Sequence, residues 1–381
     1  MSRLNRWPHR AKPAVQVTIG SKSMPAFFSV LLEGYQAVQG DFVGRLVCLA
    51  ASLWLLIWVA EPLLDAVLAI GARFNLPQSI LGAVVASAAT SAPELGTTLF
   101  SLLLSKPDPA GTVSVTVANV GIGSVIGSAV FNLAMIVGAI GVRGKVVPLE
   151  KEVVWRDGVV YGASVLLLLV LMLIGGDTLG RQAGIVLLLG YAAYAVWLVI
   201  DALRGRVRAP EGGGSPTSMT FPAALLRLLG CIVAIGLACH VLVEGVSGLS
   251  HDVAARIGVE QASVSSILSL VVVAAVTSLP DLFTSLAAMR RGDGSLAVGN
   301  AVGSNTFDLL VCLGLPYAVL GTHPLAAETL WMTRYLLGTA VVFLMLMLWD
   351  ARVTVSKGWV LLASYGGFLV LASWLILHSH Q

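Results

Sequence analysis

The stretch SAATSAPEL, residues 87–95, occurs a second time in altered form as AAVTSLPDL, residues 274–282. A second motif follows each copy: GSVIGSAVFN at residues 123–132 and GNAVGSNTFD at residues 299–308. The two motifs come in the same order in each half of the chain, and an ordered repeat of this kind indicates a duplicated architecture. These stretches decide the predicted fold once their surroundings are considered.

The composition is that of a membrane protein. Of 381 residues, 57% are hydrophobic and 11% are charged, whereas soluble domains carry about 25% charged residues. The mean hydropathy is +0.89. Because so few charges would leave a soluble surface uncovered, we exclude a soluble enzyme, a nucleic-acid-binding domain and a disordered chain. The net charge of +3 indicates no anionic partner.

Apolar runs of about 20 residues, long enough to cross a bilayer as helices, recur along the chain. We expect ten spans: 44–70, 78–104, 112–140, 158–175, 183–201, 223–254, 263–289, 295–320, 331–350 and 358–377. They form two five-helix halves, 44–203 and 223–381, after an N-terminal tail at 1–43 and on either side of a Gly/Ser/Pro-rich linker at 204–222. The tail has no apolar signal-peptide core, and both Met1 and Met24 stay open as the start.

Five is an odd number, so the second half must enter the membrane from the opposite side. The expected fold is therefore an all-α integral membrane protein of ten transmembrane helices, arranged as two inverted five-helix repeats with a site at the bilayer midplane. Loops after odd-numbered helices carry most of the positively charged loop residues, which predicts that these loops are cytoplasmic and that both termini lie outside. The positive charge of the N-terminal tail is at odds with this orientation. These residues are Arg73, Arg143, Lys145, Lys151, Arg156, Arg204, Arg206, Arg208, Arg290, Arg291, Arg352 and Lys357.

The spacing of the first motif gathers oxygen atoms on one helical face. Its polar positions follow i, i+3, i+4 and i+7, and they are Ser87, Thr90, Ser91 and Glu94 in one copy and Ala274, Thr277, Ser278 and Asp281 in the other. Pro93 and Pro280 lack an N–H, which frees a carbonyl and kinks each helix. Carbonyls, hydroxyls and carboxylates are the ligands of hard cations.

The second motif adds oxygen pairs at i and i+4, Ser128 with Asn132 and Ser304 with Asp308. Its G-x-x-x-G spacing, at 123/127 and 299/303, would let these helices pack closely. Placing Glu94, Asp281 and Asp308 in mid-membrane costs about 3 kcal/mol each, or about 9 kcal/mol together. Neither motif contains a basic residue to neutralise them. We therefore interpret the three acids as ligands of a cation.

Both motifs resemble the alpha repeats of the cation/Ca²⁺ exchanger superfamily, the sodium/calcium exchangers, and are most similar to its potassium-dependent branch. The resemblance rests on SAPEL followed by GSAVFN, and on TSLPDL followed by VGSNTFD, within repeats at about 80–140 and about 265–320. It implies that Glu94 and Asp281 are the central Ca²⁺ ligands, completed by the carbonyls of Thr90 and Thr277. It also implies flanking Na⁺ sites lined by Ser91, Ser128, Asn132, Ser278, Ser304 and Asp308, with backbone oxygens from Ser87 and Ala274.

The implied function is exchange of Ca²⁺ for Na⁺, with K⁺ as an optional further ion. A Ca²⁺/H⁺ antiporter and, less favoured, a passive cation channel are the alternatives. Ala89 and Val276 replace glycines that the family has before its Thr-Ser pair, which leaves ion selectivity open. We expect no enzymatic activity and no covalent cofactor. Expected partners are membrane lipid and small inorganic cations, without nucleic acid, and the sequence does not predict the oligomeric state. The expected location is the plasma (cell inner) membrane. We expect the four cysteines to be packed small hydrophobic residues.

Overall fold

The computed structural model describes residues 41–73, 87–105, 115–143, 146–150, 153–203, 219–290, 292 and 294–378. Within these ranges, nine helical segments are long and apolar enough to cross a membrane, so the chain is a multi-pass membrane protein. Most of the expected tail and linker lies outside the described residues, as does the start of the span expected at 78–104.

The first half contains helices α2 (Phe42–Arg73), α4 (Ser87–Thr90), α5 (Ala92–Leu104), α6 (Val115–Val130), α7 (Val137–Val142), α8 (Gly158–Gly175) and α9 (Arg181–Leu203). The second half contains α10 (Phe221–Ile257), α11 (Gln261–Leu268), α12 (Ala274–Thr277), α13 (Leu279–Arg290), α14 (Gly294–Phe307), α15 (Gly314–Leu320), α16 (Ala327–Leu348) and α17 (Val355–His378). Four π-helical turns interrupt or open these helices: η2 (Phe131–Ile136), η3 (Val153–Asp157), η4 (Ser269–Val273) and η5 (Asp308–Cys312).

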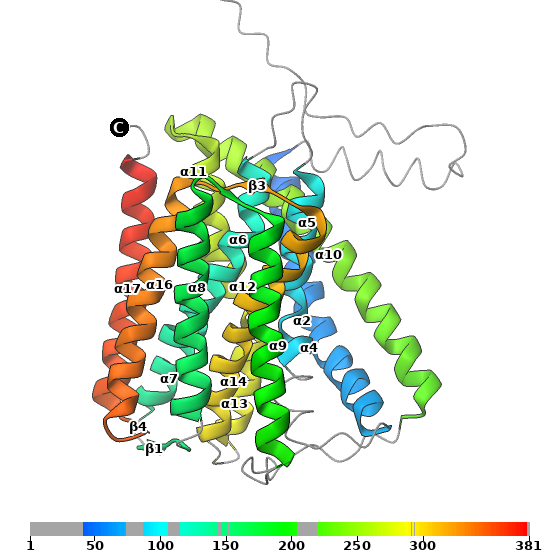
Figure 1. Ribbon diagram of the computed structural model, residues 1–381. Helices are drawn as coiled ribbons and strands as arrows, with labels where there is room; N and C mark the ends of the chain where they lie inside the picture. Colours follow the sequence, from blue (N-terminus) through cyan, green and yellow to red (C-terminus); the bar gives the residue numbers. More distant parts are fainter. Residues whose placement is uncertain are drawn as a thin grey trace, which may run out of the picture.

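Two short antiparallel strand pairs connect loops of the two halves. Strand β1 (Val147–Pro148) pairs with β4 (Arg352–Val353), and β2 (Thr178–Leu179) pairs with β3 (His323–Pro324). Each strand has only two residues, too few to show an alternating pattern in the sequence. The sequence analysis, which expected an all-helical fold, did not predict these strands. The β1–β4 and β2–β3 pairs lie at opposite ends of the bundle (Figure 1), so each end carries one connection between the halves.

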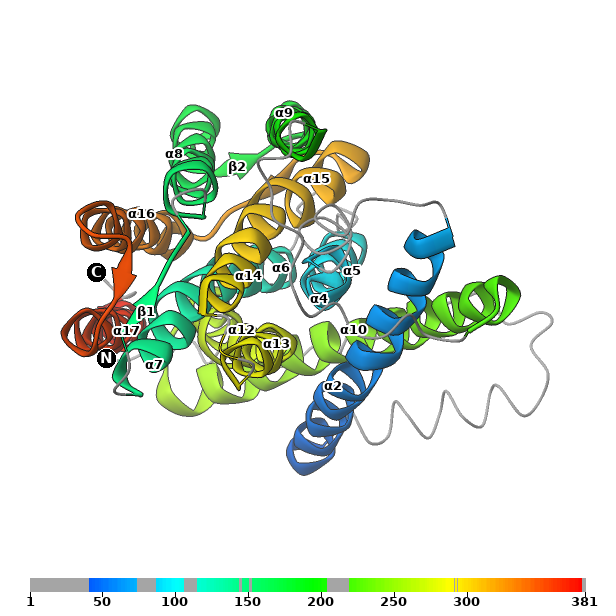
Figure 2. The same cartoon turned by 90° about the horizontal axis from the view of Figure 1, so that it is seen from below.

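The helices that carry the repeated motifs lie in the middle of the bundle. Seen along its axis, α4, α5, α6, α12 and α14 are central, α8, α9, α16 and α17 lie to one side, and α2 and α10 lie to the other (Figure 2). The central span Val115–Val142 is 83% buried, compared with 22% for the peripheral span Phe42–Leu63. The polar motifs are therefore shielded by apolar helices whose outer faces suit lipid.

Glycine brings α6 into close contact with the helix that carries the second copy of the first motif. A methyl group on Gly127 would lie 1.9 Å from the carbonyl oxygen of Leu270, and one on Gly123 would lie 2.3 Å from the hydroxyl of Ser269. The close packing predicted from this G-x-x-x-G spacing is confirmed. At Gly303 the added carbon would lie 3.5 Å from the Ser87 hydroxyl, an ordinary contact.

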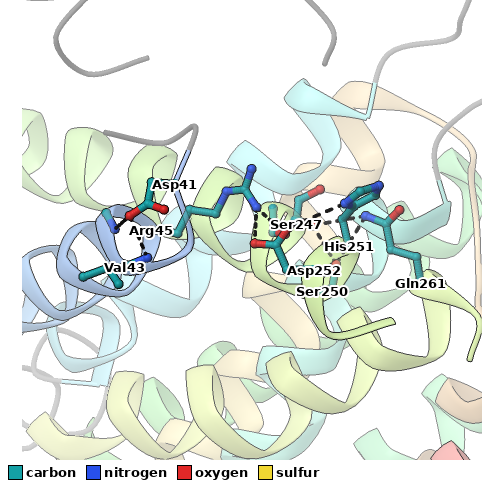
Figure 3. A network of polar contacts seen from close by, with 10 residues as sticks. Asp41, Val43, Arg45, Ser247, Ser250, His251, Asp252 and Gln261 are labelled. Atoms are coloured by element: carbon teal, nitrogen blue, oxygen red, sulfur yellow. Dashed lines mark hydrogen bonds and ion pairs between the residues drawn. The ribbon is translucent and has the colours of Figure 1, made fainter. Parts of the chain in front are cut away.

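The peripheral helices α2 and α10 pack against each other and are joined by ion pairs near both ends. Arg45 pairs with Asp252 and also donates to the carbonyl of Gly248 at 3.1 Å (Figure 3). Towards the other end, Arg227 of α10 lies 3.7 Å from Asp65 of α2. Because each helix supplies one cation and one anion, the two contacts fix both helices in a defined antiparallel register.

Arg156 was expected in the loop before the fourth span, and the structure places it in a helix instead. The fourth span begins at η3 rather than at residue 158, and Arg156 lies within η3. Its guanidinium donates to Asp157 at 2.7 Å and to Asp201 of α9 at 3.4 Å. Partners of opposite charge make burial of a charged group tolerable, and hydropathy alone does not reveal that such partners are present.

Candidate cation-binding site

The two helices that carry the first motif break at equivalent residues. Helix α4 ends at Thr90 and α5 begins at Ala92, while α12 ends at Thr277 and α13 begins at Leu279. Proline lies two residues after each intervening serine and lacks the N–H that a continuous helix needs. As a result, Glu94 and Asp281 each lie in the first turn of a new helix, where the helix dipole favours a carboxylate.

Glu94 and Asp308 share one hydroxyl group. The Oγ of Ser128 lies 3.2 Å from Oε1 of Glu94 and 3.4 Å from Oδ2 of Asp308, and it can donate to either carboxylate. The same oxygen lies 2.6 Å from Oγ of Ser278. Ser128 therefore connects α6 with α5, with η5 and with the break between α12 and α13.

Asp281 is held by a second set of contacts. Its Oδ2 accepts a hydrogen bond from the Asn132 amide at 2.9 Å, and its Oδ1 accepts one from the Ser304 hydroxyl at 2.8 Å. The Ser304 hydroxyl in turn lies 3.4 Å from that of Thr90. Asn132 and Thr90 belong to the first half and the other two residues to the second, so the halves meet at this carboxylate.

All twelve predicted site residues are buried in this region, with at most 4% of each exposed. They are Ser87, Thr90, Ser91, Glu94, Ser128, Asn132, Ala274, Thr277, Ser278, Asp281, Ser304 and Asp308. The Thr90 and Thr277 hydroxyls donate to the carbonyls of Ser87 and Ala274 at 3.2 and 3.3 Å. Which of these oxygens bind an ion stays a prediction.

The carboxylates do not form one compact cluster. In the part of the chain that is described, no three acidic, histidine or cysteine side chains lie close enough to hold a metal ion together. Glu94 and Asp308 lie around Ser128, and Asp281 lies between Asn132 and Ser304. An ion at this centre would therefore take most of its ligands from hydroxyl, amide and carbonyl oxygens, as hard cations do.

Several buried oxygens at the site are available to a ligand. The Oγ of Ser91, Oε2 of Glu94 and Oδ1 of Asn132 have no hydrogen-bond partner within the described ranges. Buried polar atoms are almost always paired, and leaving one unpaired costs about 1–3 kcal/mol. All three atoms belong to residues of the predicted site, and a cation bound to any of them would be its missing partner.

Sequence reasoning missed the π-helical turns at the second motif. The N–H of Val137 donates to the carbonyl of Asn132, and that of Leu313 donates to the carbonyl of Asp308, in each case five residues earlier. Such turns are frequent at functional sites, but no pattern of apolar residues signals them. One residue in η5 was also missed: Cys312, interpreted from sequence as simple packing, contacts Asp308.

Buried carboxylates, hydroxyls and broken helices lie at the centre of this membrane protein, between two groups of apolar helices. The family model for the sodium/calcium exchanger protein matches residues 45–200 and 223–374. This chain belongs to the sodium/calcium exchanger family.

Known proteins agree with that family and fold. The inner membrane protein YrbG of Escherichia coli is 28% identical over 282 residues, which cover 70% of this chain and 78% of YrbG. A structure of the sodium–calcium exchanger NCX_Mj matches with a TM-score of 0.55 and 21% identity, covering 90% of this chain and all of the other. A structure of the H⁺/Ca²⁺ exchanger CAX matches with a TM-score of 0.64 and 13% identity, covering 93% of each chain. At these identities the two structures are evidence for the fold alone.

Proposed function

We propose that this protein is a secondary active antiporter that exchanges Ca²⁺ for Na⁺, with or without K⁺, by alternating access. Two inverted repeats of five helices would rock about the central site, in the plasma (cell inner) membrane. One observation carries the proposal: three fully buried carboxylates lie where the two halves of the chain exchange hydrogen bonds. A change in the ion bound there acts on both halves at once.

Charge arithmetic accounts for exchange. With Glu94, Asp281 and Asp308 ionised, the empty site carries −3, which three Na⁺ neutralise. One Ca²⁺ leaves −1, which K⁺ or H⁺ at Asp308 would absorb. Moving each uncompensated charge through the membrane involves about 2.3 kcal/mol per 100 mV. An empty site would therefore stay on its side while a loaded one crosses, which makes transport an obligatory exchange.

The shared hydroxyl of Ser128 offers a way for the two ion positions to influence each other. A hydroxyl has one proton and donates one strong hydrogen bond at a time. A cation beside Glu94 would draw the Ser128 oxygen towards itself and turn its proton towards Asp308 or Ser278. Occupancy at Glu94 would thereby change the hydrogen bonding of Asp308, 3.4 Å from the same oxygen.

Coupling to protons is the second candidate. Among the described residues, none of the ion pairs includes Glu94, Asp281 or Asp308. Carboxylates without a cationic partner can be neutralised by H⁺ as well as by Na⁺. Both forms of the proposal use the same three acids and differ in the ion that returns.

Reconstitution into liposomes tests the function. Uptake of Ca²⁺ would be measured with outward gradients of Na⁺, K⁺ and H⁺ imposed one at a time, with membrane potential clamped. Uptake driven by Na⁺ supports the first candidate, and uptake that follows only the pH gradient supports the second. Uptake without any counter-ion gradient indicates a channel. If no gradient drives uptake, Ca²⁺ antiport is wrong.

Asp308→Asn refines the assignment. We expect this variant to lose dependence on K⁺ or on pH while it keeps the Ca²⁺ affinity set by Glu94 and Asp281. Asp350→Asn, in the connection between α16 and α17, is the matched control, because it removes a carboxylate of equal size far from the site in the sequence. Unchanged coupling in Asp308→Asn would contradict the role given to Asp308.

A further inference from the structure

Cys312 brings a sulfur atom to the oxygen-rich site. It is the last residue of η5, one turn after Asp308, and its side chain is completely buried. Its Sγ lies 3.6 Å from Oδ1 of Asp308 and 3.5 Å from the carbonyl oxygen of Ser91, and its single S–H can donate to either. The thiol therefore contacts a carboxylate of the second half and the helix break of the first half at the same time.

The duplicated architecture does not require this thiol. Asn132 is the counterpart of Asp308 in the first motif, and the residue four positions after it is Ile136, which carries no donor atom. Among the described cysteines, Cys231 and Cys239 lie on α10, and Cys48 lies on α2. Cys239 donates to the carbonyl of Pro93, the residue before Glu94, but among the described cysteines only Cys312 forms a hydrogen bond with a site carboxylate. Its sulfur therefore makes the two halves of the site chemically different.

Two residues in the contact network of the sulfur carry oxygens without a hydrogen-bond partner. The Oγ of Ser91 and Oε2 of Glu94 are buried without hydrogen-bond partners. Ser91 also supplies the carbonyl that faces the Cys312 sulfur, and Glu94 shares the Ser128 hydroxyl with Asp308, whose other oxygen faces the same sulfur. The sulfur thus belongs to the same network of contacts as two residues that carry oxygens without a partner. Thiol sulfur selects soft metal ions, whereas carboxylate and carbonyl oxygens select hard ones.

We propose that Cys312 is a soft donor of the cation site, through which the site binds thiophilic divalent cations such as Cd²⁺ more tightly than its oxygens alone would. The location of that ion at the Ca²⁺ position rests on the proposed function. When Cd²⁺ binds, the S–H bond breaks, the sulfur gives its electron pair to the metal and the proton leaves to water. No atom changes its oxidation state, and Asp308 lies within reach as a second ligand.

Ultraviolet spectroscopy tests the sulfur–metal bond without transport. The purified protein in detergent would be titrated with CdCl₂, and the charge-transfer absorption of a cadmium–thiolate bond followed. The variant with Cys48, Cys231 and Cys239 replaced by serine keeps Cys312 alone and should show the band. Cys312→Ser in the otherwise unchanged chain should lose the matching part of the difference spectrum. A band that persists unchanged in Cys312→Ser would overturn the proposal.

Competition links the sulfur to selectivity. In proteoliposomes, the Cd²⁺ concentration that halves Ca²⁺ uptake would be divided by the KM for Ca²⁺. Cys312→Ser should raise this ratio by at least about tenfold, because it exchanges a soft donor for a hard one. Cys231→Ser, a buried thiol on α10, is the control and should leave the ratio as it is.

The outcomes separate the two proposals. If uptake persists and the ratio is unchanged in Cys312→Ser, Cys312 is not a selectivity residue, and Ca²⁺ antiport is unaffected. If the cadmium band depends on Cys312 but excess Ca²⁺ does not suppress it, the metal site stands, and the assignment of this centre to Ca²⁺ is wrong.

Discussion

Replacing Gly127 by alanine tests the contact that holds the two halves together at the site. The added methyl group would lie 1.9 Å from the carbonyl oxygen of Leu270 and 2.6 Å from Cβ of Ala274. Such carbons almost never come within 3.0 Å of another atom, so α6 and η4 must separate by about 1.1 Å. Applied to the neighbouring contact, this shift lengthens the 2.6 Å separation of the Ser128 and Ser278 hydroxyls to about 3.7 Å, beyond hydrogen-bond range.

The energetic consequence follows from two opposing terms. Overpacking a buried position costs about 1–3 kcal/mol, and more where backbone must move, while glycine to alanine within a helix gains about 1 kcal/mol. Because the obstacle here is a backbone carbonyl, we expect Gly127→Ala to lose about 2 kcal/mol of unfolding free energy. Gly303→Ala is the matched control in the other repeat. Its methyl group would meet only an ordinary 3.5 Å contact, so we expect a gain of about 0.5–1 kcal/mol.

Unfolding in detergent micelles, followed by tryptophan fluorescence, measures the two differences in stability. Ca²⁺ uptake by proteoliposomes measures the effect on the site, and we expect uptake to fall in Gly127→Ala. The reasoning is refuted if Gly127→Ala matches the wild type in both stability and uptake, or if Gly303→Ala is destabilised equally.

Three further predictions concern other parts of the molecule. Asn132→Ala removes the amide that donates to Asp281. It should weaken Ca²⁺ binding by about 10–100-fold, as loss of a ligand-orienting contact does. Isothermal titration calorimetry measures this affinity, and an unchanged value would contradict the prediction. Arg156→Ala leaves Asp157 and Asp201, both nearly buried, without their cation, and Asp157 keeps only its hydrogen bond from Tyr194. This change should cost about 3–5 kcal/mol of unfolding free energy, and stability equal to that of the wild type would contradict it. His323 lies outside the membrane spans and is bonded to Ser105 at 2.9 Å, and burial lowers its pKa. Because the unfolded state then binds more protons, stability falls as pH drops below the unfolded-state pKa of about 6.5. Between pH 8 and pH 5, the thermal midpoint of His323→Gln should therefore fall less than that of the wild type. Equal falls in the two proteins would contradict this role of His323.

Some of the site could be predicted because its signals are local. An acidic residue inside an apolar span is rare and costly and can be recognised within that one segment, so Glu94, Asp281 and Asp308 stood out from their positions in the sequence. The proline two residues after each Ser in the first motif likewise breaks its own helix, and the breaks at Ser91 and Ser278 were found where expected. Apolar length predicted ten spans, and nine of them are found as membrane-length helices within the described residues, since crossing a bilayer is a property of a single segment.

Other features depend on which residues meet. The sequence did not indicate that Arg156 lies inside a span, because the two aspartates that make its burial tolerable come from different positions, one of them on α9. The π-helical turns at Asn132 and Asp308 leave no periodic signature. The contact of Cys312 with Asp308 was missed for a related reason: a cysteine in an apolar run looks the same whether its sulfur faces a leucine or a carboxylate.

The sequence by itself determined that this chain spans the membrane, that its two halves are related, and that three acids lie where hydrocarbon would exclude them. These conclusions follow from transfer free energies and helical spacing, which act within one segment. Only the tertiary structure decided that Ser128 serves two carboxylates, that Asn132 and Ser304 hold the third, and that a thiol adjoins Asp308. Hydrogen bonds act over about 3 Å, so contacts between residues up to 221 positions apart exist only after the helices have packed.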